Sequence, residues 1–279
     1  MRLCVITDEI SDDLAHALTV AGSLGIGAVE LRVVDGANIV THPTASWRRV
    51  AAMLAAGGFT CPVLDSPFLK ETPVPGDPDW AGVDWSTFSR AVEVAHLLGA
   101  GAVRVFSGRR RTGRPADRGA GGYQEDTVVH WLTDTLGEAA DHAQTAGLEV
   151  AVEIEHVCTV ATAAEAAALG TDGWRYVLDP GNESYLTGAA ARADLVPELA
   201  PRIGHVHVKD VDPAGAWTRV GTGLVGWPDQ LGALRDSGYS GHLSMETHYA
   251  VPPAGLETAT RESVAALRSL AGTAGIDLT

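Results

Sequence analysis

The sequence predicts an α/β protein built as a single (β/α)8 barrel over residues 1–279. Eight short runs rich in Val, Ile and Leu are spread along the chain, and segments with helical spacing separate them. Repeated strand–helix alternation requires parallel strands with crossovers, which leaves a doubly wound sheet or a barrel. The count of eight, one helix per strand and the length of 279 residues favour the barrel, commonly called a TIM barrel.

The predicted strands are spaced so that one helix fits between each pair. Several begin shortly after a glycine that can end the preceding helix, as in SLGIGAVEL, LLGAGAVRV and TAGLEVAVE. The eight runs are 3–7, 27–32, 60–66, 101–107, 149–155, 174–181, 204–210 and 241–248.

Between these runs, apolar residues recur at the three- and four-residue spacing of one helix face. The clearest faces are Leu14, Leu18, Ala21 and Leu24; Trp47, Val50, Ala51 and Leu54; and Val264, Leu267 and Leu270. Two connections are long, 67–83 and 108–123, and both follow predicted strands. Loops at the C-terminal rim of a barrel carry lids and substrate contacts, so we expect these two to border the site.

Composition excludes several classes of function. The formal net charge of −15 argues against nucleic-acid binding and against an anionic membrane surface, which both require clustered Lys and Arg. No apolar run approaches the ~18 residues that span a bilayer, and the N-terminal MRLCVITDEISDD does not read as a signal peptide. The three cysteines are far apart and predict neither disulfides nor a zinc knuckle. We therefore expect a cytoplasmic protein.

Polar residues gather at the ends of the last four predicted strands. In a barrel, inward-pointing polar residues at the C-terminal strand ends form the active site. Strand parity places Glu153 with Glu155 on one face, and His205, His207 and Lys209 on one face. The full set is Glu153, Glu155 and His156; Asp179 and Asn182; His205, His207 and Lys209; Ser244, Glu246 and His248.

Carboxylates buried inside a barrel without partners would cost several kcal/mol each. A divalent cation that takes Glu, Asp, His and Glu from four neighbouring strands removes this cost. Such an oxygen-rich set suits Mn²⁺ or Mg²⁺, with Co²⁺ and Zn²⁺ as alternatives. The alternative for a glutamate such as Glu153 is a buried salt bridge with an arginine such as Arg104.

Taken together, the motifs VAVEIEH, VLDPGN, HVHVKD and LSMETH resemble the xylose isomerase-like TIM barrel family of sugar isomerases and epimerases. The segments TDEISDD, VELRVVDGANIV, LDSPFLK and VRVFSGR are similar to the opening strands of sugar phosphate isomerase/epimerase members, so the resemblance covers nearly the whole chain. It implies that Glu153, Asp179, His207 and Glu246 bind the metal. It also implies that Glu153 and Glu246 are the catalytic acid and base.

The resemblance and the strand ends together suggest residues that contact substrate. Many epimerases have a substrate-contacting His three residues after the Asp ligand, and this chain has an Asn there. The predicted set is Asn182, Lys209, His205, Glu30, Arg32 and Lys70. Lys209 would bind a substrate oxygen or pair with Glu246; the alternative is a structural ion pair with Asp210 or another carboxylate. His205 could instead hydrogen-bond inside the barrel, and Lys70 could be a solvated loop residue. Glu30 and Arg32 form an inward pair that either serves the substrate or fills the barrel floor.

Three weaker features complete the predicted site. We interpret Glu155 and His156 as groups that orient metal ligands. The segment SGRRRTGR, residues 107–114, either binds an anionic group of the substrate or is solvated. Gly221 and Gly223 resemble a family G-x-G loop that closes over substrate.

These residues predict a metal-dependent isomerase or epimerase of a small carbohydrate. Glu153 and Glu246 would move a proton next to a carbonyl, through an enediolate that the metal stabilises. A dehydratase of a sugar or cyclitol, similar to inosose dehydratase, is the first alternative, and a non-catalytic carbohydrate-binding barrel is the second. The expected partners are a small-molecule carbohydrate and, as an open possibility, a second copy in a homodimer; no nucleic acid or membrane is expected.

Overall fold

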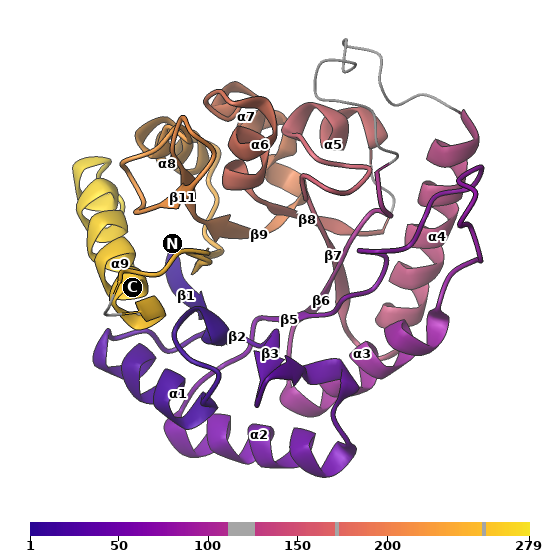
Figure 1. The fold of residues 1–279 in the computed structure, drawn as a ribbon, viewed down its shortest axis with the longest axis horizontal. Helices are drawn as coiled ribbons and strands as arrows, with labels where there is room; N and C mark the ends of the chain where they lie inside the picture. The colour runs from indigo at the N-terminus through magenta and orange to yellow at the C-terminus, as the bar shows by residue number, and fades with distance from the viewer. Residues whose placement is uncertain (111–125, 171–172, 253–254) are drawn as a thin grey trace.

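The computed structural model describes residues 1–110, 126–170, 173–252 and 255–279, and it confirms the predicted (β/α)8 barrel (Figure 1). Eight strands pair in parallel in the order β2, β1, β12, β9, β8, β7, β6, β5. Isolated parallel bridges Ala28–Thr60 and Leu31–Leu64 connect the two edges and close the ring. The barrel strands are β1 (Arg2–Ile6), β2 (Val29–Glu30), β5 (Val63–Asp65), β6 (Ala102–Val105), β7 (Glu149–Glu153), β8 (Arg175–Leu178), β9 (Ile203–Val208) and β12 (His242–Met245).

Helices surround the strands on the outside of the barrel (Figure 1). They are α1 (Leu14–Ser23), α2 (Thr44–Gly57), α3 (Trp85–Leu98), α4 (Asp126–Thr145), α5 (Ala163–Leu169), α6 (Pro180–Thr187), α7 (Val196–Leu199), α8 (Trp227–Asp236) and α9 (Gly255–Thr273). Short 3₁₀ turns cover Thr7–Glu9, Ile39–Thr41, Ala193–Leu195 and Ala200–Arg202. Two small hairpins pair β3 (Val33–Val34) with β4 (Ala37–Asn38), and β10 (Asp210–Val211) with β11 (Trp217–Thr218).

Local sequence explains where the helices begin and end. Asp13 caps α1, since its carboxylate accepts the backbone N–H of Ala15 at 2.9 Å. Gly99 ends α3 with φ +69°, and Gly147 follows α4 with φ +74°, a left-handed conformation that glycine adopts without strain. These glycines confirm the helix ends that the sequence predicts.

The main core lies between the helices and the outer face of the barrel. Trp47 and Leu267 are buried in it, as the helical spacing predicts, and the Trp47 indole donates to the Ile39 carbonyl at 2.8 Å. Burying these faces supplies most of the hydrophobic driving force of the fold.

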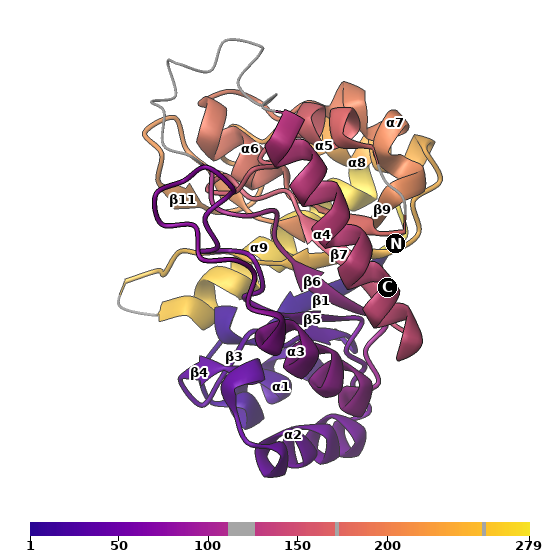
Figure 2. The ribbon, with the colours of Figure 1, turned by 90° about the vertical axis from the view of Figure 1, so that its right-hand side faces the viewer.

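A second, small apolar cluster lies inside the barrel and contains Val63, Ala102, Ala151 and Val177. Side chains two positions apart on a strand point to the same face. The next inward residues on these strands are therefore Asp65, Arg104, Glu153 and Asp179, all buried. The barrel interior thus changes from small apolar residues to charged ones toward the C-terminal ends of the strands. In Figure 2, β3, β4 and β11 lie at that end and both chain termini lie at the other.

Two further expectations can be checked against the fold. Cys4, Cys61 and Cys158 are buried and free, as expected for a chain without disulfides. Within the part of the chain that the structure describes, no helix has the length and apolar character needed to cross a membrane.

Candidate metal centre

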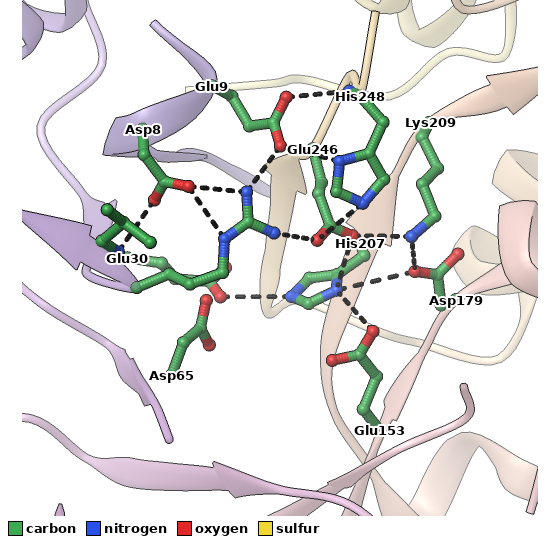
Figure 3. A network of polar contacts seen from close by, with 12 residues as sticks. Asp8, Glu9, Glu30, Asp65, Glu153, Asp179, His207, Lys209, Glu246 and His248 are labelled. Atoms are coloured by element: carbon green, nitrogen blue, oxygen red, sulfur yellow. Dashed lines mark hydrogen bonds and ion pairs between the residues drawn. The ribbon is translucent and has the colours of Figure 1, made fainter. Parts of the chain in front are cut away.

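Four residues that the sequence assigns to a metal meet at the C-terminal end of the barrel (Figure 3). One ligand atom from each lies within 4.8 Å of the ligand atoms of the other three, and all four residues are buried. Glu153 ends β7, Asp179 directly follows β8, His207 lies in β9 and Glu246 directly follows β12. Neighbouring parallel strands end at one rim, and this brings together residues that are far apart in the sequence.

The imidazole of His207 lies at the middle of this cluster. Its Nδ1 is 3.2 Å from Glu246 Oε2, and 3.6 Å from both Glu153 Oε1 and Asp179 Oδ2. Among the described residues this buried nitrogen has no hydrogen-bond partner. A buried nitrogen that faces three carboxylate oxygens fits a divalent cation, which would bind all four atoms. The donor set therefore suits the cation that the sequence predicts.

The other nitrogen of His207 explains how the ring is held. Nε2 lies 3.1 Å from Glu30 Oε2, so Glu30 can accept the Nε2 proton and leave the Nδ1 lone pair for a metal. His205, one inward position earlier on β9, contacts the other oxygen of Glu30 through its own Nε2. Glu30 therefore joins two histidines, and His205 hydrogen-bonds inside the barrel.

Glu30 and Arg32 do not pair with each other in the structure, and their contact with substrate stays a prediction. Arg32 instead donates to Asp8, Glu9 and Glu246, while Glu30 is occupied by the two histidines. Strand parity puts Glu30 and Arg32 on one face, but they lie at different heights and meet different partners across the barrel. Figure 3 shows Asp8 and Glu9 on the side of Glu246 that faces away from His207.

The sequence DPGN determines the geometry around Asp179. Asp179 caps α6, because its Oδ1 accepts the backbone N–H of Asn182 at 2.9 Å. Pro180 occupies the first helical position, which proline favours. The Asn182 amide also donates to Asp179 Oδ2 at 3.0 Å and to Glu153 Oε1 at 3.3 Å. Asn182 is buried and holds two of the candidate ligand carboxylates; its contact with substrate stays a prediction.

Lys209 is buried beside the cluster. Its Nζ lies 2.7 Å from Asp179 Oδ2 and donates to Glu246 Oε2 at 2.8 Å. The Trp217 ring lies over it, with its centroid 5.1 Å from Nζ. Gly181 leaves room for the lysine stem, since a Cβ there would lie 2.4 Å from Lys209 Cγ. The ammonium thus pairs with two of the candidate ligand carboxylates, and its contact with a substrate oxygen stays a prediction.

Burial and neighbouring charges act in opposite directions on the ionisable groups. Burial raises the pKa of Glu153, but Arg104 and His207 outweigh it and hold that pKa below its usual range. Burial likewise raises the pKa of Glu246, but the charges of Lys209, His248 and His207 have the larger effect. The pKa of Glu246 is therefore held well below its usual range. Burial lowers the pKa of His207, whereas Glu30, Glu246 and Glu153 raise it well above the ordinary value.

Three other groups of ligand-type side chains occur in the described ranges, and each shares members with this cluster. They are Cys4, Glu30 and His205; Glu9, Glu246 and His248; and Glu30, Asp65 and His207. In the groups that contain Glu30, its oxygens are already taken by histidines. The cluster around His207 Nδ1 is the best candidate, because it alone among the described groups has four members and all four are buried.

Several predicted mouth residues are paired with each other. Lys70 donates to Glu155 at 3.1 Å, and His156 Nδ1 lies 2.5 Å from Glu155 and 3.1 Å from Asn182 Oδ1. His156 thus reaches a ligand carboxylate through Asn182, in line with the orienting role predicted for Glu155 and His156.

The arginine-rich segment is only partly described. Arg109 lies within ion-pair distance of Asp77 and Asp79, and Arg110 pairs with Glu165. Residues 111–114 of this segment lie outside the described residues.

The loop around Gly221 and Gly223 is held from inside the protein. The two glycine N–H groups donate to Asp210 Oδ2 at 2.9 and 3.1 Å, so they are taken up by Asp210. A Cβ on Gly223 would lie 2.3 Å from the Val211 carbonyl, which explains the glycine. The β10–β11 hairpin just before this loop carries Trp217, which stacks on Tyr185 with ring centroids 5.0 Å apart.

Sequence reasoning missed Asp8, Glu9, Asp65 and Trp217. Asp65 is inward on β5 by parity with Val63, a signal that could have been used. Asp8 and Glu9 follow β1 in a 3₁₀ turn, where period-2 reasoning no longer applies.

Comparison with known proteins agrees with this fold. A D-tagatose 3-epimerase-like protein is 16% identical, with a TM-score of 0.75 and coverage of 99% of this chain and 98% of that one. The IOLI protein with a bound zinc atom is 18% identical, with a TM-score of 0.76 and coverage of 98% and 99%. A Mycobacterium smegmatis xylose isomerase-like TIM barrel protein in complex with magnesium is 16% identical, with a TM-score of 0.64 and coverage of 93% and 88%.

No curated protein sequence matches the chain significantly. The family model described as "Xylose isomerase-like TIM barrel" matches residues 18–270, which is most of the chain. This match agrees with the resemblance seen in the strand-end motifs, so the chain belongs to the xylose isomerase-like TIM barrel family.

Proposed function

We propose that this protein is an enzyme, a divalent-cation-dependent isomerase or epimerase of a small carbohydrate. The observation that carries the proposal is the buried Nδ1 of His207, which lacks a hydrogen-bond partner among the described residues and faces the carboxylates of Glu153, Asp179 and Glu246. The similarity to a D-tagatose 3-epimerase-like protein supports the choice of a carbohydrate as substrate.

The four residues Glu153, Asp179, His207 and Glu246 would hold the cation. Three carboxylates and one imidazole favour Mn²⁺ or Mg²⁺, and the set also accepts Co²⁺ or Zn²⁺. When bound, the cation polarises a substrate carbonyl and acidifies the neighbouring C–H group.

The proton transfers fall to the two glutamates. Their pKa values are held below the usual range, so both are ionised at neutral pH and either can accept a proton from substrate. If the other glutamate first gains a proton from water and delivers it to the opposite face of the same carbon, the product is an epimer. Return of the abstracted proton to the adjacent carbon gives an aldose–ketose isomer. Hydrogen bonds from Lys209 and Arg32 hold the Glu246 carboxylate in place for this transfer.

Turnover in D₂O tests the proposal. A panel of ketoses, aldoses and cyclitols is incubated with Mn²⁺, and a true substrate gains deuterium at the carbon that loses its proton. Glu153→Gln and Glu246→Gln should each lower turnover by ~10²–10⁴-fold, the usual contribution of a general acid or base. Glu149→Gln is the matched control, because Glu149 lies at the other end of the same strand and is exposed.

Other outcomes would favour the other classes of protein. Loss of water from a cyclitol, with deuterium in the product, would establish a dehydratase instead. Binding of a carbohydrate without conversion of any panel member would favour a non-catalytic barrel. Unchanged turnover in both glutamine variants would refute the roles assigned to Glu153 and Glu246. The cytoplasmic location and the homodimer stay predictions, for cell fractionation and sedimentation to test.

A further inference from the structure

The two oxygens of Glu246 have different partners. Oε2 faces the centre of the cluster, 3.2 Å from His207 Nδ1. Oε1 faces away, accepts a hydrogen bond from Arg32 Nη1 at 2.6 Å and lies 3.2 Å from His248 Nε2. Arg32 is itself fixed, since it donates to Asp8 at 2.9 Å and to Glu9 at 2.6 Å. The outer oxygen of Glu246 is therefore held by an arginine that cannot easily move.

Glu153 shows the same division on the opposite side of His207. Oε1 faces the centre, 3.6 Å from His207 Nδ1, and Oε2 accepts a hydrogen bond from Arg104. Arg104 is buried, lies over the Phe106 ring at 4.3 Å, and has its Nε 3.5 Å from Asp65 Oδ1. A second arginine thus holds the outer oxygen of the second glutamate.

Asp179 completes the pattern without an arginine. Its Oδ1 accepts the Asn182 N–H at 2.9 Å, and its Oδ2 faces His207 Nδ1 at 3.6 Å. In each of the three carboxylates, the oxygen that faces away from His207 Nδ1 is bound by a protein donor. The oxygens that face Nδ1 also have donors, Lys209 for Glu246 and Asp179, and Asn182 for Asp179 and Glu153.

We propose that Arg32 and Arg104 are positioning residues that keep Glu246 and Glu153 monodentate toward the cation. This inference rests on the proposed function. Three bidentate carboxylates and one imidazole would supply more atoms than an octahedral ion accepts. With one atom from each of the four residues, about two positions of an octahedral ion stay available for substrate oxygens or water. The arginines thus reserve the positions that the reaction needs.

This role makes a prediction that differs from a structural one. If an arginine is removed, its glutamate is free to rotate and bind the cation through both oxygens. Metal affinity then stays the same or increases, whereas the cation loses exchangeable water and the enzyme loses turnover. An arginine that only supports the fold would, when removed, weaken metal binding and leave the hydration of any bound cation unchanged.

The experiment uses Mn²⁺ as the probe with the full-length chain. Electron paramagnetic resonance of free Mn²⁺ gives the affinity, and water-proton relaxation gives the number of exchangeable waters on the bound ion; neither requires turnover. The variants are Arg32→Met and the double variant Arg104→Met with Asp65→Asn, which also removes the carboxylate that Arg104 leaves behind. Arg175→Met is the control, because Arg175 pairs with exposed Glu149 far from the cluster.

We expect about two exchangeable waters in the parent protein and in Arg175→Met, and about one or fewer in each test variant, without loss of affinity. Arg32→Lys and Arg104→Lys retain a cationic donor, so the number of exchangeable waters on their bound Mn²⁺ should lie between those of the parent and the methionine variants. If a methionine variant does not fold, the corresponding lysine variant replaces it in the experiment. Unchanged hydration in folded variants would overturn the inference. Absence of any Mn²⁺ site in the parent protein would instead overturn the proposed function.

Discussion

Replacing Lys209 with methionine removes a buried ammonium and keeps most of the side-chain volume. The Nζ lies 2.7 Å from Asp179 and 2.8 Å from Glu246, so two ligand carboxylates lose their shared cation. Removing one partner of a buried ion pair typically costs ~3–5 kcal/mol. At ~2–4 °C per kcal/mol for a chain of about this size, the metal-free protein should melt on the order of 10 °C lower.

A bound divalent cation neutralises the same two carboxylates, so the loss should be much smaller with saturating Mn²⁺. The assay is thermal denaturation of parent and variant in EDTA and in Mn²⁺. Lys70→Met is a matched control, because Lys70 is the other lysine of the chain and also pairs with a glutamate. Its side chain is 38% exposed, so we expect a change below ~1 kcal/mol in either condition. An equal loss for Lys209→Met with and without Mn²⁺ would refute the idea that lysine and metal balance the same charges.

Three further changes test the surroundings of the cluster. Gly181→Ala places a Cβ 2.4 Å from Lys209 Cγ, and this overpacking should cost ~1–3 kcal/mol in urea denaturation; an unchanged midpoint would show that Lys209 is free to move. Glu30→Gln should weaken Mn²⁺ binding ~10–100-fold in calorimetric titration, because glutamine keeps only one acceptor oxygen where His205 and His207 use two; equal affinity would contradict this. Burial and the neighbouring His205 lower the pKa of His242 from 6.5 to about 4 in the folded protein. Between these two pH values His242 is therefore protonated in the unfolded chain but not in the folded one, which favours unfolding as the pH falls. The free energy of unfolding, measured by urea denaturation at several pH values, should therefore fall more steeply from pH 6.5 to 4 for the parent than for His242→Gln. An equal pH dependence for the two proteins would exclude this contribution.

The fold and the gathering of polar side chains at one rim could be predicted because both depend on short-range periodicity, whereas the choice of Glu153, Asp179, His207 and Glu246 as metal ligands is implied by the family resemblance. Alternation along β9 puts His205, His207 and Lys209 on one face, and parallel strands bring their C-terminal ends to one rim. The same parity places Glu153 in the barrel interior. These predictions need no knowledge of which strand lies opposite which.

Contacts across the barrel could not be predicted in this way. Parity shows that Glu30 and Arg32 point inward, but the stagger of the strands decides that Glu30 meets His207 and Arg32 meets Glu246. The G-x-G loop is a similar case, because the N–H groups of Gly221 and Gly223 are bound by Asp210, eleven residues or more before them.

Metal binding by the stripped protein tests the central claim most directly. Calorimetric titration with Mn²⁺, together with elemental analysis of protein purified without chelator, should show one tight divalent-cation site per chain. His207→Ala should abolish that site, because the only imidazole of the four-residue set is lost. A parent protein that binds no divalent cation, or a His207→Ala variant that binds it unchanged, would contradict the account.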